Sequence, residues 1–122
     1  MAGVINRVRG PFNVSRPAQA VGIAALSDKD FVQKSVALAR EGRSWLTKEL
    51  QALGLKVYPS VGNFLLIEFG VKAEEIRLTL KDKAIFIRQM GAYNLLQCLR
   101  MTVGTMEDNA RVVAELKAIL KL

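Results

Sequence analysis

The sequence predicts an α+β fold in which a small sheet of about four strands has helices packed on one face. Three observations favour this architecture. The chain has 122 residues, of which 51% are hydrophobic and 24% charged, as in an ordinary globular domain. Apolar residues recur at helical spacing in some segments and alternate with polar residues in others. The resulting elements follow the order helix, helix, strand, strand, helix, strand, strand, helix.

Two helices are predicted first. Small apolar residues from Pro17 to Leu26 indicate a short helix with the proline in its first turn. Ser27 is a candidate N-cap for a long second helix, because acidic residues that favour a first turn follow it. The second helix ends at Gly54, a typical C-cap residue. Its apolar stripe consists of Val32, Val36, Ala39, Leu46, Leu50 and Leu53.

Four strands and a third helix follow. Residues 55–58 and 63–69 are apolar strands in succession, which favours an antiparallel pair. Residues 73–81 have the spacing of a modest helix, and residues 85–88 and 99–103 alternate like strands.

The last predicted element is an amphipathic helix. Thr105 and Asp108 have the spacing of a capping box, in which the two side chains bond each other's backbone N–H groups. Val112, Leu116 and Ile119 form its apolar stripe. The sequence contains no internal repeat and no low-complexity segment.

Charge and composition narrow the function classes. The net charge is +7, but the cations are interleaved with acidic residues, which indicates a mixed surface more than a nucleic-acid stripe. No apolar run approaches the ~20 residues that cross a bilayer, and no membrane partner is predicted. Cys98 is the single cysteine, so no internal disulfide forms, which suits a cytoplasmic location. Its apolar neighbours predict a buried structural thiol.

Common catalytic motifs are absent from the sequence. There is no histidine, which removes Ser-His and Cys-His nucleophile pairs and the usual zinc ligands, so no metal site is predicted. There is also no glycine-rich phosphate loop of the familiar kinds. These absences favour a binding or structural domain.

One pair of residues has the chemistry of a binding site. Strand pleating places Arg88 and Arg100 away from the most apolar face of their strands. Two guanidinium groups on neighbouring strands would form a clamp for carboxylate or phosphate oxygens. The alternative is that both arginines are exposed strand residues that make surface ion pairs.

Four segments resemble the histidinol-phosphate aminotransferase family. They are Asn6–Ser15 (NRVRGPFNVS), Pro59–Leu66 (PSVGNFLL), Ile87–Met90 (IRQM) and Leu99–Thr105 (LRMTVGT). Their order and spacing match the family across nearly the whole chain, from about Val4 to Leu120.

The resemblance implies the carboxy-terminal small domain of a fold-type-I pyridoxal-phosphate enzyme. Residues 1–16 would be a lead-in from a large domain that this chain lacks, and residues 17–122 the small domain. The parent would be a homodimer that transfers an amino group between histidinol phosphate and 2-oxoglutarate, the oxo acid that corresponds to glutamate. In the family, arginines matching Arg100 and Arg88 bind the substrate's anionic end. Asn63 matches a position near the substrate entrance.

The resemblance also implies that the catalytic parts lie elsewhere. The family's Schiff-base lysine, the aspartate at the pyridine nitrogen and most phosphate-cup residues lie upstream of the matching region. No catalytic or cofactor-binding residue is therefore assigned in this chain. We expect the chain alone to bind pyridoxal phosphate negligibly and to have no aminotransferase activity, because the cofactor supplies the electron sink.

Simpler roles and other functions stay open. Asn63 could be a turn residue, Asn13 and Ser15 could cap a helix, Tyr93 could be merely exposed, and Trp45 could serve packing. The parent could instead act on phenylalanine and tyrosine, or be a related phospho-amino-acid decarboxylase. From other classes, the chain could be a basic nucleic-acid-binding module, or a structural module that self-associates through an exposed apolar patch.

Overall fold

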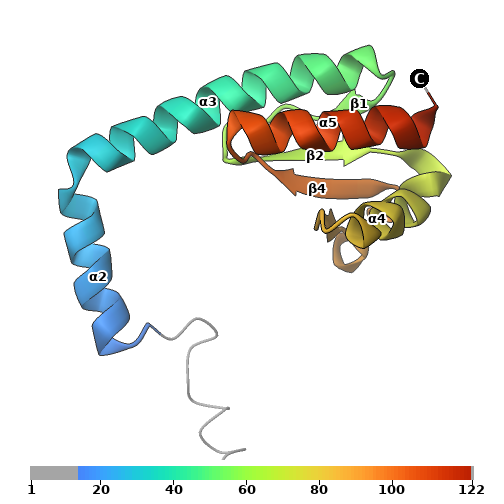
Figure 1. The fold of residues 1–122 in the computed structure, drawn as a ribbon. Helices are drawn as coiled ribbons and strands as arrows, with labels where there is room; N and C mark the ends of the chain where they lie inside the picture. Colours follow the sequence, from blue (N-terminus) through green and yellow to red (C-terminus); the bar gives the residue numbers. More distant parts are fainter. Residues whose placement is uncertain (1–13, 122) are drawn as a thin grey trace, which may run out of the picture. The chain divides into compact units, whose positions relative to one another are not determined.

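The computed structural model describes residues 14–121 (Figure 1). Residues 1–13, which include Asn13 and most of the segment 6–15 that resembles the family, lie outside the described residues. The chain divides into two compact units between Ser35 and Val36, and each is described by itself. No helix within the described range has the length and apolar character needed to cross a membrane.

The first unit contains α2 (Arg16–Ser27) and the start of α3 (Lys29–Ala52), which confirms both predicted helices. The Ser15 hydroxyl accepts a hydrogen bond from the backbone N–H of Ala18 at 3.4 Å, as an N-cap does. None of the side chains of α2 is buried.

The predicted cap of the long helix was wrong by one residue. Ser27 is the last residue of α2, and its hydroxyl donates to the carbonyl of Ile23 at 3.0 Å. The Asp28 carboxylate instead accepts from the backbone N–H of Phe31 at 3.0 Å. A serine inside a helix bonds back to the preceding turn, so the next polar residue becomes the cap.

The second unit contains a four-stranded antiparallel sheet with the order β1-β2-β4-β3. The strands are β1 (Lys56–Val57), β2 (Phe64–Glu68), β3 (Arg88–Gln89) and β4 (Cys98–Thr102). The predicted antiparallel pair of β1 and β2 is confirmed. The helices of this unit are the rest of α3, α4 (Ala73–Asp82) and α5 (Met106–Leu120), with short 3₁₀ turns at Gly70–Lys72 and Gly91–Tyr93.

The third strand is shorter than its sequence predicts. Strand pairing begins only at Arg88, because the backbone N–H of Ile85 bonds the carbonyl of Leu80 and belongs to the end of α4. The predicted alternation nevertheless holds. Ile85 is buried and Ile87 half-buried, whereas Phe86 and Arg88 are exposed.

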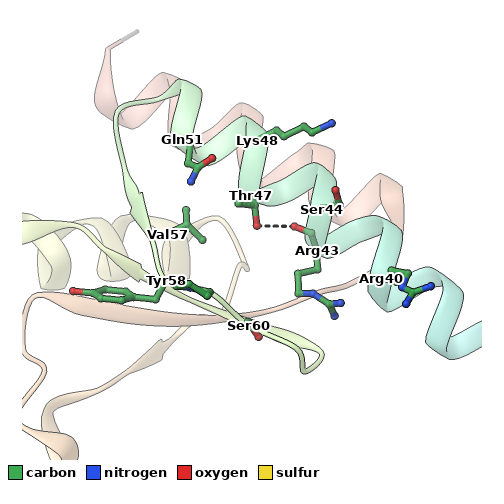
Figure 2. Close-up of a pocket in the computed structure, with 10 residues that line it drawn as sticks. Arg40, Arg43, Ser44, Thr47, Lys48, Gln51, Val57, Tyr58 and Ser60 are labelled. Carbon is green, nitrogen blue, oxygen red and sulfur yellow. Dashed lines mark hydrogen bonds between the residues drawn. The ribbon is translucent and has the colours of Figure 1, made fainter.

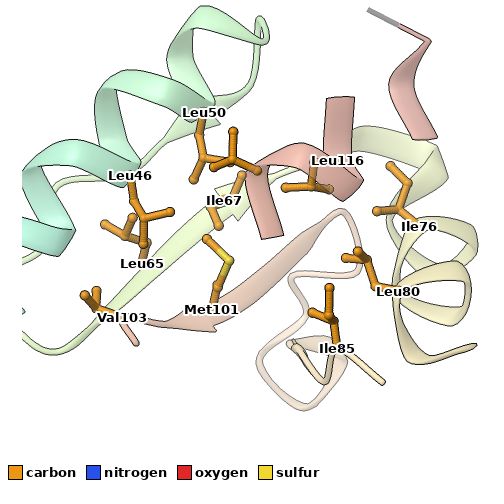
Figure 3. Packing of buried hydrophobic residues seen from close by; sticks show 11 residues of the cluster. Leu46, Leu50, Leu65, Ile67, Ile76, Leu80, Ile85, Met101, Val103 and Leu116 are labelled. Atoms are coloured by element: carbon orange, nitrogen blue, oxygen red, sulfur yellow. The ribbon is translucent and has the colours of Figure 1, made fainter. Parts of the chain in front are cut away.

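The core lies between the sheet and the helices (Figure 3). It receives side chains from α3, α4 and α5 and from one face of β2 and β4. These residues are Leu46, Leu50, Leu65, Ile67, Ile76, Leu80, Ile85, Met101, Val103, Val113 and Leu116. The predicted α+β fold with helices on one face is therefore confirmed.

The apolar stripe of α3 is buried only in its second half. Leu46 and Leu50 are fully buried, and Leu53 packs against the core. Val32 and Val36 are exposed among the described residues. The predicted stripe of α5 does cover the core, and its predicted capping box is present. Trp45 packs against the core, in agreement with its predicted packing role.

Candidate functional site

The face of the sheet opposite the core carries the candidate site. Strand pleating turns alternate residues of β2 and β4 to this side, which we call the outer face. It is formed by Phe64, Leu66, Glu68, Arg88, Arg100 and Thr102, together with Lys56 and Tyr58 at the β1 edge. All of these side chains are exposed or half-buried.

Arg88 and Arg100 are brought together on the outer face. They are direct partners in the pairing of β3 with β4, so their side chains leave the sheet on the same side. Neither forms an ion pair with a carboxylate among residues 14–121. Like charges directly opposite each other destabilise a sheet. The two adjacent positive charges therefore oppose the strand pairing, and their arrangement suits an anionic ligand.

The side chain of Arg100 lies against Phe64. Its guanidinium carbon is 5.0 Å from the centre of the Phe64 ring, which is cation–π distance. Leu66 is opposite Arg100 in the neighbouring strand. These contacts orient a half-buried guanidinium on the outer face. Sequence reasoning missed Phe64 as a site residue, because its contact depends on the register between β2 and β4.

A polar cluster occupies the β1 edge of the outer face. The Tyr58 hydroxyl donates to Glu68 Oε2 at 2.7 Å, and Lys56 Nζ lies 3.1 Å from the same oxygen. The ammonium of Lys56 also lies 4.8 Å from the centre of the Tyr58 ring. The hydrogen bond from Tyr58 and then that from Lys56 lower the pKa of Glu68, so the carboxylate stays ionised.

Cys98 is buried on the same side of the sheet, opposite Glu68. Burial and, to a lesser degree, the Glu68 charge raise the pKa of its thiol. The prediction of a buried cysteine is confirmed. A neutral, buried thiol is not a nucleophile.

Asn63 lies just before β2 and outside the row of Arg88 and Arg100. Its backbone carbonyl accepts from the N–H of Val103 at 2.8 Å, and its side chain is exposed. No hydrogen bond of the Asn63 side chain to its own backbone is present within the described range. Tyr93 lies in the loop between the arginine strands and is exposed.

The turn before Asn63 is attached to α3 by Arg43. The Arg43 guanidinium donates to the carbonyl of Gly62 at 2.8 Å and more weakly to that of Val61 at 3.4 Å. A hollow of about 460 Å³ lies beside it, and the cations Arg40 and Lys48 also line this hollow. Figure 2 shows these side chains on α3. Because Arg43 is bonded to these carbonyls, it serves the turn more than a ligand.

Residues 14–121 by themselves contain no enclosed site for a Schiff base with pyridoxal phosphate. All nine lysines of the chain are exposed, so none offers the enclosed amine that a Schiff base requires. No group of three or more potential metal ligands occurs in the described part either. The outer face instead presents two adjacent guanidinium groups, whose donors match the oxygens of an anion.

Comparison with known proteins identifies the family of this chain. The model of the family "Aminotransferase class I and II" matches residues 1–116. Histidinol-phosphate aminotransferase of Rhodospirillum centenum is 48% identical over 124 residues, which cover 99% of this chain and 34% of that protein. The Paramagnetospirillum magneticum enzyme of the same name is 46% identical, over 96% of this chain and 33% of that protein. The chain thus spans about a third of the curated relatives it matches.

Solved structures of such enzymes contain the same fold. The histidinol-phosphate aminotransferase of Sinorhizobium meliloti, in complex with pyridoxal-5'-phosphate, aligns with a TM-score of 0.76 and 27% identity over 98% of this chain and 34% of that one. The Clostridium acetobutylicum enzyme aligns with a TM-score of 0.77, and at 21% identity, over 98% of this chain and 37% of that one, it supports the fold alone. The family match over nearly the whole sequence shows that this chain belongs to the class I and II aminotransferases.

Proposed function

We propose that this chain is the carboxy-terminal, substrate-binding part of a pyridoxal-phosphate-dependent histidinol-phosphate:2-oxoglutarate aminotransferase. The 40–48% identity to enzymes of that name supports the substrate. In such enzymes the cofactor supplies the electron sink, and the protein supplies binding and orientation. This chain would contribute binding, because none of its lysines is enclosed.

The observation that carries the proposal is the direct pairing of Arg88 with Arg100. Two adjacent guanidinium groups present donors that match phosphate or carboxylate oxygens. Arg100 is the main residue that binds the anion, because Phe64 and Leu66 flank it and orient its side chain. Arg88 lies on the edge strand, where it is more exposed and assists.

The same proposal places the chain within a longer protein. Residues 1–16 lead in from a large domain that holds the cofactor, and residues 17–122 form the small domain. Asn63 lies near the substrate entrance, and the parent is a cytoplasmic homodimer. The large domain would cover the outer face and enclose the arginine pair.

Kinetics of the full-length protein test the arginine pair. Arg100→Lys keeps the charge but removes the bidentate fork, so KM for histidinol phosphate and for 2-oxoglutarate should rise about tenfold or more. Arg88→Lys should have a smaller effect in the same direction. Arg77→Lys is the matched control, because Arg77 pairs with Glu74 on α4. Equal KM values for the Arg100→Lys and Arg77→Lys enzymes would contradict the proposal.

A second substrate class is aromatic amino acids such as phenylalanine and tyrosine. The apolar side chains of Phe64 and Leu66 beside Arg100 favour it, since they could contact a ring while the arginine binds a carboxylate. Comparing kcat/KM of the full-length protein for histidinol phosphate and phenylalanine separates the two. A preference for phenylalanine would contradict histidinol phosphate as the substrate.

A further inference from the structure

Glu68 is the only acidic residue in the four strands of the described sheet. It lies on the outer face opposite Cys98, whereas Arg100 lies two residues along β4 opposite Leu66. Residues in this diagonal relation are about 7–8 Å apart at the backbone, within reach of two long side chains. A carboxylate bound to Arg100 would occupy the fork that the substrate anion needs.

In the structure Glu68 turns to the other side of its strand. Its carboxylate accepts the hydrogen bond of Tyr58 at 2.7 Å and contacts Lys56 at 3.1 Å. Both partners come from β1 and the residue after it, and β1 and β4 flank β2 on opposite sides. The carboxylate is therefore held toward β1 and away from Arg100.

We propose that Tyr58 and Lys56 are positioning residues that hold Glu68 toward β1 and thereby keep the guanidinium of Arg100 available for the anionic group of the substrate. This inference rests on the proposed role of Arg100. The two partners cooperate, because the Lys56 ammonium also lies over the Tyr58 ring. Tyr58 has the larger part, since its hydroxyl binds the carboxylate at the shorter distance.

Titration of this chain with inorganic phosphate, followed by NMR of the arginine Nε–Hε groups, tests the inference. The variants are Tyr58→Phe, Glu68→Gln and the double variant. Tyr58→Phe keeps the net charge and removes one donor, which releases Glu68 toward Arg100. We expect phosphate to bind about two- to fivefold more weakly, the range of one exposed ion pair.

Glu68→Gln should restore phosphate binding in the Tyr58→Phe chain. If Glu68 acted only through its general negative charge, Glu68→Gln would strengthen phosphate binding by the same factor in both backgrounds. A released carboxylate predicts more: Glu68→Gln must strengthen binding by a larger factor in the Tyr58→Phe chain than in the wild type. Glu74→Gln in both backgrounds is the control and should show no such difference, because Glu74 is bound by Arg77 on α4.

The outcomes separate this inference from the proposed function. If phosphate shifts the Arg100 signal but Tyr58→Phe binds as the wild type does, or Glu68→Gln acts equally in both backgrounds, the positioning role is wrong and the clamp remains. If phosphate leaves the Arg100 signal of the wild type unchanged, the clamp and the positioning role both fail. Lys56→Gln, compared with Lys72→Gln as a charge control, gives the same test should Tyr58→Phe disturb folding.

Discussion

A Cβ atom on Gly42 would lie 2.7 Å from Cγ1 of Val103, closer than real contacts allow. Gly42 is a buried residue of α3, and Val103 follows β4. The same Cβ would lie 2.9 Å from Nδ2 of Asn109, whose amide bonds both the N–H and the carbonyl of Gly104. The absence of a side chain at Gly42 lets α3 approach this junction.

Gly42→Ala should therefore destabilise the protein, although alanine is the better helix former. Crowding of Val103 and Asn109 should cost about 1–3 kcal/mol in urea unfolding. The matched control is Gly22→Ala in α2, where a Cβ meets nothing within 4 Å. There the alanine should stabilise its helix by up to about 1 kcal/mol. The same sign for both substitutions would show that packing does not select the glycine at residue 42.

The ends of α3 and α4 provide a second matched pair. Leu55 N–H bonds the carbonyl of Leu50, and Ile85 N–H bonds that of Leu80, so each helix ends in a Schellman motif. The left-handed residue is Gly54 (φ +76°) in the first and Ala84 (φ +58°) in the second. Ala84→Gly should raise the free energy of unfolding by about 1 kcal/mol, and Gly54→Ala should lower it by a similar amount. Chemical denaturation measures both; a destabilised Ala84→Gly protein would refute the strain at this position.

Acid should weaken the fold partly through Glu68. Hydrogen bonds from Tyr58 and then Lys56 lower its pKa in the folded state below the ordinary value of 4.5. The ionised carboxylate therefore contributes its full stability above pH 4.5, and loses it as the pH falls through the folded pKa. The free energy of unfolding of Glu68→Gln should fall less steeply with acid than that of the wild type. Parallel curves for the two proteins would contradict a native-state pKa shift at Glu68.

Cys98 should react slowly with alkylating reagents in the native protein. It is 4% exposed, and burial raises the pKa of its thiol, so little thiolate is present at neutral pH. Mass spectrometry after iodoacetamide treatment should show a large acceleration in denaturing urea. Equal rates with and without urea would mean that the loop beside Cys98 opens readily.

Phe64 should strengthen anion binding without touching the anion. Phe64→Leu keeps an apolar side chain but removes the ring face that lies 5.0 Å from the Arg100 guanidinium. A cation–π contact at an exposed site contributes about 0.5–1 kcal/mol, so phosphate should bind about two- to fivefold more weakly. Phe86→Leu is the control, because Phe86 is exposed and precedes β3. A loss of similar size in both variants would argue against the contact.

Local sequence patterns predicted most of the fold. Helical spacing located α2, α3, α4 and α5, and the Thr105 capping box fixed the start of the last helix. Two errors arose where neighbouring signals compete. Asp28, and not Ser27, caps α3. The backbone N–H of Ile85 bonds the last turn of α4 and does not pair in β3. Both differences arise from particular hydrogen bonds, which the spacing of residues in the sequence does not predict.

The site could be predicted only in part. Alternation along each strand placed Arg88 and Arg100 on the side away from the core, which is local information. Their direct pairing, the contact of Phe64 with Arg100 and the interaction of Tyr58 with Glu68 depend on register between strands. Register follows from the whole sheet, so a single-strand pattern does not reveal these partners.

Alternate residues of the same two strands serve the core and the proposed binding face. In β2 and β4 the odd-numbered residues are buried, and the even-numbered ones lie on the outer face, where all but the buried Cys98 are exposed or half-buried. Exchanges at the exposed and half-buried even positions should thus alter ligand choice at little cost to the fold, so substrate preference can diverge while the scaffold persists. Insertion or deletion of one residue would do the opposite, because every inward and outward side chain would change sides together.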